Sequence, residues 1–305
     1  MPAFDRAHDI RVRTEAFQWL AARVAEHGDV LPRDVLARGF TFQGRRVPLL
    51  GPQGIFKPAV MEVPLSITTA PNGPYDDAFG PAFLSYRYRG TDPDHPDNAG
   101  LRFAMARRLP LAYLHGVVPG RYVATWPVYI QGDDPRALTF QVSVDDLAHA
   151  NLSERDDFIA REGTEARRRY VTSLVRGRLH QRAFRERVLR AYRHQCSLCR
   201  LRHDELLDAA HIIPDREAEG EPVVSNGLAL CRLHHAAFDR FFLGVRPDYV
   251  IEVRSDILRE RDGPTLMYAI QGLHGQPITV PRRIEDRPAV ELLGERYDRF
   301  LRAAS

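Results

Sequence analysis

The sequence predicts an α+β protein with a β-rich N-terminal part and a C-terminal part that contains all of the cysteines. Short apolar runs separated by turn signals, which are typical of β-strands, fill residues 61–144. Apolar residues at helical spacing mark residues 8–27 and 184–192. All three cysteines fall between residues 196 and 231, where their spacing is that of metal ligands.

Length and composition limit the class of protein. A chain of 305 residues can form two domains with separate cores. No apolar run approaches the ~20 residues that cross a membrane, and the N-terminus has no apolar signal core. We therefore expect a cytoplasmic protein, whose reducing compartment suits thiol ligands. The net charge of +3 is too mild to indicate nucleic acid by itself.

The elements can be assigned in chain order. Residues 8–27 and 29–36 read as helices, and a polar loop is expected at residues 91–98. Five strands are expected, at residues 63–69, 83–90, 109–116, 120–132 and 137–144. We expect a β-rich domain over residues 1–155, a helical linker over 156–180 and a second domain over 181–305.

After the cysteine-rich stretch, the sequence indicates only a few secondary-structure elements. A helix is expected to end at Gly244, and a strand to cover residues 249–253. The last helix is expected over residues 287–301, with Pro288 near its start. Its apolar stripe predicts packing, with no sign of a chemical role.

The zinc site is predicted from the spacing of four residues. Cys196 and Cys199 form a C-x-x-C pair, and Cys231 and His234 form a C-x-x-H pair. Three cysteines and one histidine are a common structural zinc set, which leaves no open position for a substrate. The alternative is a group of free buried cysteines, since three cysteines cannot all pair in disulfides.

A second metal site follows from helix geometry. His234 and His235 are neighbours, so on a helix they point about 100° apart and do not easily share one ion. His235 and Asp239 lie four residues apart, on one face, and can hold another cation. Upstream, a strand-like run carries His211, and a turn carries Asn226.

His211, Asn226 and His235 around this zinc set resemble the His-Asn-His (HNH, or ββα-metal) nuclease motif. The resemblance covers about sixty residues. It implies that His211 is the general base, that Asn226 orients His211, and that His235 and Asp239 hold the catalytic ion. It also implies products with a 5′-phosphate and a 3′-hydroxyl. The alternative is a zinc fold with a few satisfied polar residues.

The sequence departs from the HNH pattern at one position. Many HNH enzymes carry a metal-binding Asp or His directly before the base, where this chain has Ala210. Asp208 lies on the same strand face as Ala210 and is expected to be a weak or indirect ligand. Mixed nitrogen and oxygen ligands admit Mg²⁺, Mn²⁺ or Ni²⁺ beside the structural Zn²⁺.

A weaker constellation lies in the β-rich part. Tyr75, Asp76 and Asp77 precede a strand that carries Tyr88 before Arg89-Gly90. Aromatic faces and a carboxylate are what an unpaired cytosine requires. The order resembles the SRA domain, which binds 5-methylcytosine flipped out of the duplex. The alternative is an ordinary half-buried strand.

Together these resemblances imply an SRA-like, β-barrel-type N-terminal domain with flanking helices, followed by a zinc-stabilised HNH nuclease domain. Such an arrangement is similar to modification-dependent (type IV, McrA-like) restriction endonucleases. The expected substrate is double-stranded DNA containing 5-methylcytosine or 5-hydroxymethylcytosine, and a homodimer is expected, with no membrane partner. Two alternatives stay open: a zinc-containing DNA-binding regulator without nuclease activity, and a nuclease whose N-terminal domain reads sequence or contacts protein.

Overall fold

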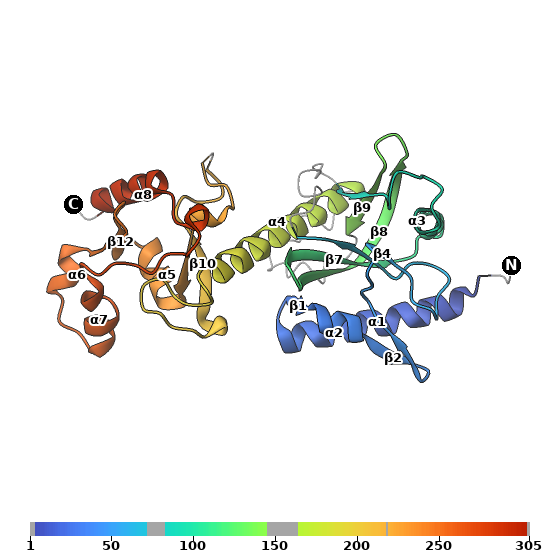
Figure 1. Cartoon of the computed structure of the whole chain (residues 1–305), viewed down its shortest axis with the longest axis horizontal. Helices are drawn as coiled ribbons and strands as arrows, with labels where there is room; N and C mark the ends of the chain where they lie inside the picture. The colour runs from blue at the N-terminus through green and yellow to red at the C-terminus, as the bar shows by residue number, and fades with distance from the viewer. Residues whose placement is uncertain (1–3, 72–82, 145–163, 218, 304–305) are drawn as a thin grey trace. The chain divides into compact units, whose positions relative to one another are not determined.

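The computed structural model describes residues 4–71, 83–144, 164–217 and 219–303. Over these residues the chain separates into two compact units, Met1–Arg182 and Ala183–Ser305, each with its own hydrophobic core (Figure 1). The division falls inside helix α4 (Thr164–Ala191).

Within its described residues, the N-terminal unit combines a mixed sheet with three helices before α4. Its helices are α1 (Arg6–His27), α2 (Arg33–Arg38) and α3 (Pro96–Ala106). Its strands are β1 (Val30–Pro32), β2 (Phe40–Phe42), β3 (Arg45–Val47), β4 (Ile55–Phe56), β5 (Ser66–Thr69), β6 (Leu84–Arg87), β7 (Leu111–Val118), β8 (Arg121–Asp134) and β9 (Thr139–Val144).

Seven of these strands form one sheet in the order β4-β5-β7-β8-β9-β6, with β1 added to β8. Among the described strands, only the β5–β7 pair is parallel. All eight residues of β7 are buried, which is what a strand covered on both faces requires. The buried face of α1, formed by Val12, Ala16 and Leu20, packs in the same core as residues of β7 and β8.

The sheet curls so that strands from its two ends approach each other. Tyr86 of β6, the last strand, donates a hydrogen bond of 3.4 Å to the carbonyl of Thr68 in β5, near the other end. A side chain at Gly54 would lie 2.8 Å from the Tyr86 hydroxyl, so this glycine allows the approach. The result is a half-barrel rather than a flat layer.

The expected strands at residues 63–144 are confirmed as β5 to β9. Two expectations were wrong in part. The second helix is preceded by strand β1, which occupies residues 30–32. The expected loop at residues 91–98 ends in the first turn of α3, where Pro96 occupies the first helical turn and His95 accepts from the Asp97 amide.

The C-terminal unit holds the end of α4, two hairpins and four further helices. Its strands are β10 (Leu207–His211), β11 (Gly227–Cys231), β12 (Leu243–Val245) and β13 (Ile251–Val253). Its helices are α5 (Arg232–Asp239), α6 (Ser255–Arg259), α7 (Pro264–Ala269) and α8 (Val290–Ala303).

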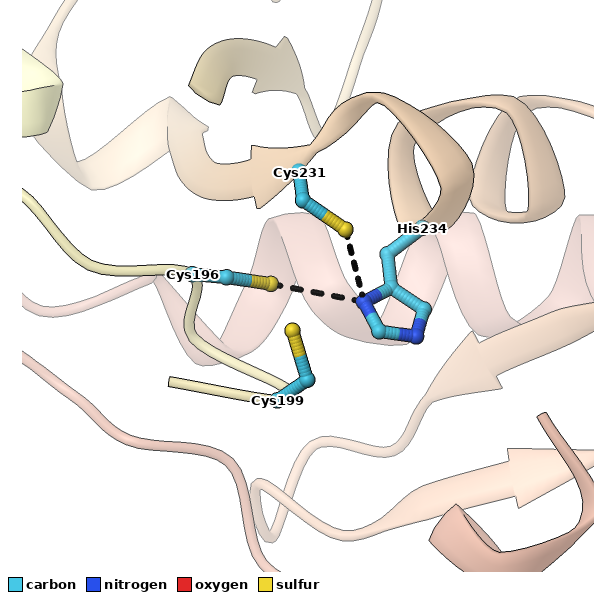
Figure 2. A group of neighbouring side chains, drawn as sticks. All are labelled: Cys196, Cys199, Cys231 and His234. Atoms are coloured by element: carbon cyan, nitrogen blue, oxygen red, sulfur yellow. Dashed lines mark hydrogen bonds between the residues drawn. The ribbon is translucent and has the colours of Figure 1, made fainter. Parts of the chain in front are cut away.

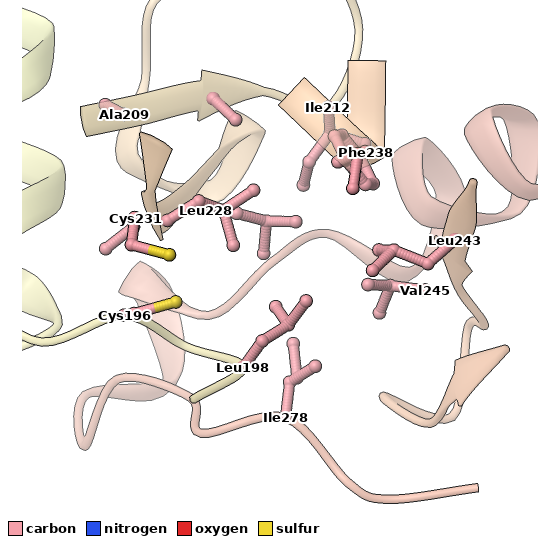
Figure 3. Packing of buried hydrophobic residues seen from close by; sticks show 14 of the residues in the cluster. Cys196, Leu198, Ala209, Ile212, Leu228, Cys231, Phe238, Leu243, Val245 and Ile278 are labelled. Atoms are coloured by element: carbon pink, nitrogen blue, oxygen red, sulfur yellow. The ribbon is translucent and has the colours of Figure 1, made fainter. Parts of the chain in front are cut away.

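One apolar core joins these elements, with Leu198, Leu228, Phe238 and Ile278 among its members (Figure 3). The helix expected to end at Gly244 instead ends at Asp239, and Gly244 lies in β12. A side chain at Gly244 would lie 2.8 Å from the ring of Phe300 in α8. The glycine therefore permits close packing of α8 on β12, rather than terminating a helix.

Candidate active site

The predicted zinc ligands come together in the C-terminal unit. One ligand atom from each of Cys196, Cys199, Cys231 and His234 lies within 4.8 Å of all the others. His234 Nδ1 lies 3.4 Å from Cys196 Sγ and 3.2 Å from Cys231 Sγ (Figure 2). Zinc–ligand bonds of about 2.0–2.3 Å in a tetrahedron place ligand atoms roughly 3.5–3.8 Å apart. The cluster therefore fits zinc.

Local backbone structure presents these four side chains. A tight turn returns the chain after Cys196, because the Arg200 amide donates to the Cys196 carbonyl at 2.9 Å. Cys231 ends β11 and precedes the first turn of α5, which carries His234. His234 Nε2 lies 2.7 Å from the carbonyl of Ala269. A carbonyl only accepts, so Nε2 carries the proton and Nδ1 is left to bind metal.

The thiols and the imidazole of the cluster compete for protons, so each group shifts the pKa of its neighbours. Hydrogen bonding with Cys196 lowers the pKa of Cys231 and raises the pKa of Cys199. Burial favours the neutral form of His234, but hydrogen bonds from its ring to the sulfurs outweigh it and raise its pKa to about 10. A bound cation would replace these shared protons, since zinc binds thiolates and neutral imidazole.

A ββα arrangement follows the zinc knuckle. β10 pairs antiparallel with β11, so that His211 lies opposite Gly227, and α5 leaves the end of β11. His211 is half-buried at the end of β10. Burial lowers the pKa of His211, which favours the neutral imidazole that a general base requires.

His235 lies between two carboxylates, on a different face of α5 from His234 of the Cys₃His cluster. Its Nε2 is 3.4 Å from an oxygen of Asp239, and its Nδ1 is 3.4 Å from an oxygen of Asp208. Hydrogen bonding to Asp208 raises the pKa of His235. The two ring nitrogens point in opposite directions, so one ion bound to His235 can share it with only one of the two carboxylates.

Asn226 is fully buried and does not reach the His211 ring through any hydrogen bond found among the described residues. Its side chain accepts from the Ile213 amide at 2.9 Å and donates to the carbonyls of Ile213 and Glu221 at 3.0 Å each. Asn226 thus holds the backbone two residues beyond His211. Ala210 is buried in the core and offers no ligand atom.

Three side chains that the sequence gave no reason to select also border this region. Phe184 of α4 stacks on His211, and Arg185 lies 3.7 Å from an oxygen of Asp208. Arg296 of α8 lies 3.9 Å from Asp239 and donates to the Phe238 carbonyl at 3.0 Å. The last helix therefore brings a charge to the site, where only packing was expected.

Of the residues expected to bind a base, Tyr75, Asp76 and Asp77 lie outside the described residues. Tyr88 is buried, and its hydroxyl bonds to Asp133 and accepts from Arg102. The residue also borders a cavity of about 290 Å³ between strands from the two ends of the half-barrel. Other residues that line this cavity are Gly54, Thr68, Thr69, Tyr86 and Gly90.

Comparison with protein families gives a match within the C-terminal unit. The family described as HNH endonuclease matches residues 196–246. A search of curated proteins gave no match. A solved structure titled "Modification dependent TagI restriction endonuclease" is similar at 18% identity and a TM-score of 0.32, covering 78% of this chain and 81% of that chain. A TM-score this low does not support a functional argument.

The family match covers the C-x-x-C turn, the β10–β11 pair, α5 and β12, and it ends one residue after β12. It thus includes all four residues of the Cys₃His cluster together with His211, Asn226, His235 and Asp239. None of the helices in the described parts of the chain is long and apolar enough to span a membrane. By sequence and by geometry, residues 196–246 of this chain form an HNH endonuclease domain.

Proposed function

We propose that this chain is a divalent-metal-dependent DNA endonuclease that acts on DNA containing modified cytosine. The observation that carries the nuclease part is the placement of His211, His235 and Asp239 around one ββα unit beside a Cys₃His cluster. A regulator that only binds DNA would not need a half-buried, neutral histidine facing a histidine–carboxylate pair.

Zinc at the Cys₃His cluster is proposed to be structural. All four positions would be filled by protein, which leaves none for water or substrate. The ligands tie the knuckle at residues 196–199 to the junction between β11 and α5. The cluster thereby fixes how α5 is rotated relative to the strand pair.

The catalytic cation is proposed to lie between His235 Nε2 and Asp239. Their separation of 3.4 Å suits two neighbouring ligands of one small divalent ion. Asp208 would accept from Nδ1 of the same ring and so fix its orientation, as carboxylates beside metal-binding histidines commonly do. Mg²⁺, Mn²⁺ or Ni²⁺ would supply positive charge to the phosphate oxygens.

His211 is proposed to take the proton from the attacking water. Its lowered pKa keeps the ring neutral near pH 7, ready to accept. Asn226 would hold the end of β10 through the Ile213 backbone and so set the position of His211. The expected products carry a 5′-phosphate and a 3′-hydroxyl.

Recognition of the modified base is proposed for the N-terminal unit, over residues 1–155. The half-barrel has a cavity of about 290 Å³, which suits one flipped base with adjoining solvent. Tyr86 and Tyr88 border it, and the Tyr88 ring packs against Phe140 and Arg102. Because Arg102 and Asp133 occupy the Tyr88 hydroxyl and Phe140 packs on its ring, that residue would form part of the cavity wall rather than a hydrogen bond to the base.

Digestion of matched DNA tests both parts of the proposal. The zinc-loaded full-length protein is incubated with one plasmid in unmodified, 5-methylcytosine and 5-hydroxymethylcytosine forms, with Mg²⁺ or Mn²⁺. Cleavage of a modified form alone is expected. Equal cleavage of all three forms would overturn the modification dependence, and no cleavage under any condition would overturn the nuclease assignment.

We also propose a homodimer, because one HNH site cuts one strand and a double-strand break needs two such sites. Measurement of the molecular mass in solution tests this.

A further inference from the structure

An aromatic side chain from outside the HNH match covers one face of the proposed general base. Phe184 of α4 lies parallel to the imidazole of His211, with ring centroids 3.9 Å apart and 12° between the planes. Phe184 is only 2% exposed, so the contact belongs to the core of the C-terminal unit. It lies twelve residues before the first matched position.

The sequence provides the space for this contact at Gly227. Gly227 is the cross-strand partner of His211, and a side chain there would lie 2.5 Å from a methyl of Val188 and 2.9 Å from the ring of Phe184. Phe184 and Val188 are four residues apart and share one face of α4. The Tyr192 hydroxyl, one turn further, donates to the Gly227 carbonyl at 3.2 Å. The glycine thus lets α4 approach the strand pair directly opposite His211.

Packing, rather than hydrogen bonding, restrains the His211 ring. His211 Nε2 is buried and has no hydrogen-bond partner within the part of the chain that the structure describes. The Asn226 side chain bonds to the Ile213 and Glu221 backbones instead. The flat contact with Phe184 is therefore the interaction that fixes the plane of the imidazole and keeps water from that face.

We propose that Phe184 is a positioning residue, which holds the His211 ring in the orientation needed to deprotonate water. This inference rests on the proposed role of His211 as the base. The α4 helix, outside the matched domain, would then be part of the nuclease machinery. Loss of the flat contact would let the ring rotate about its side-chain bonds, so that proton transfer becomes slower while DNA binding stays the same.

Three variants of the full-length, zinc-loaded protein separate this inference from its premise. Phe184→Leu removes the aromatic face and keeps an apolar side chain. Val188→Ala trims a buried side chain at the same glycine and keeps the Phe184 ring, and so controls for lost packing. His211→Ala tests the base itself. Single-turnover cleavage of modified DNA and the DNA dissociation constant are measured for each variant.

The expected result is a fall of roughly tenfold to a hundredfold in the cleavage rate of Phe184→Leu, with unchanged DNA affinity. Val188→Ala should stay within about threefold of the wild type, because the contact with the imidazole is retained. Equal rates for the two packing variants would overturn the role of Phe184 while leaving the nuclease proposal in place. Full activity of His211→Ala would instead overturn the premise.

Nuclear magnetic resonance of histidine-labelled protein gives a readout that requires no cleavage. A ring stacked on Phe184 should shift the His211 carbon-bound ring protons upfield in the wild type. His211→Ala assigns the signal, and Val188→Ala should preserve its shift. An unshifted His211 signal in the wild type would overturn the inference even if Phe184→Leu does not fold.

Discussion

Replacement of one zinc ligand should unfold the C-terminal unit and leave the N-terminal unit folded. Cys199→Ser is the cleanest choice, because Cys199 is exposed whereas Cys196 and Cys231 are buried. The new hydroxyl therefore remains in contact with solvent and adds little desolvation cost. The variant loses a thiolate ligand, for which an alcohol is a poor substitute at neutral pH.

The expected magnitude follows from what the cluster joins. Structural zinc contributes about 10–16 kcal/mol in small zinc-binding peptides at pH 7. A whole domain is stable by only about 5–15 kcal/mol. The four ligands tie the knuckle at residues 196–199 to β11 and α5, and both cysteines of the buried pair belong to the main core. Loss of even half of the metal's contribution would therefore remove most of the unit's stability.

Metal analysis and hydrogen exchange would measure this effect. Cys199→Ser should lose its zinc, and fast exchange should appear within Ala183–Ser305 but not within Met1–Arg182. Ser197→Ala is the matched control, because Ser197 is fully buried with no partner found for its hydroxyl among the described residues. That variant should keep its zinc and its stability. One zinc per chain with slow exchange in Cys199→Ser would refute the structural role.

Three further predictions concern the remaining sites. Because burial lowers the pKa of His211 and a base acts when neutral, the cleavage rate should fall to half of its plateau at a pH below about 6.5, the ordinary histidine value; a half-maximal rate at a higher pH would contradict this. Asp208→Asn should weaken Mn²⁺ binding by about 10–100-fold and Asp239→Asn by more, as measured by calorimetry; equal losses would make Asp208 a direct ligand. In the N-terminal unit, Asp9→Ala leaves the buried Arg13 without its carboxylate partner, which should cost about 3–5 kcal/mol in urea unfolding.

The Cys₃His set and the positions of the strands from residue 63 to 144 could be predicted because their signals are local. Ligand spacing in Cys196-x-x-Cys199 and Cys231-x-x-His234 is itself the chemical requirement, and turn residues delimit each β-strand. The assignment of His234 and His235 to different metal sites also required only the helical repeat. His235 indeed lies beside Asp208 and Asp239, while His234 lies beside the sulfurs.

Other features depend on contacts between distant residues and could not be predicted. In the sequence, Gly244 looks like the end of a helix. In the structure, a glycine is needed there because the ring of Phe300, fifty-six residues later, packs against its backbone. Helix α3 was obscured by the polar, proline-containing segment that begins it. Phe184, Arg185 and Arg296 reach the site from α4 and α8, whose apolar spacing indicated only packing.

The adjacent histidines link the two metal sites mechanically. α5 has only eight residues, and its first turn is held through Cys231 and His234. Since the helix is rigid over this length, fixing His234 also fixes the direction of His235, about 100° further around the axis. Arg296 holds the other end of α5 through the Phe238 carbonyl. Zinc bound at the cluster would therefore set the rotation of the helix that presents His235 and Asp239, and so the geometry offered to the proposed catalytic ion.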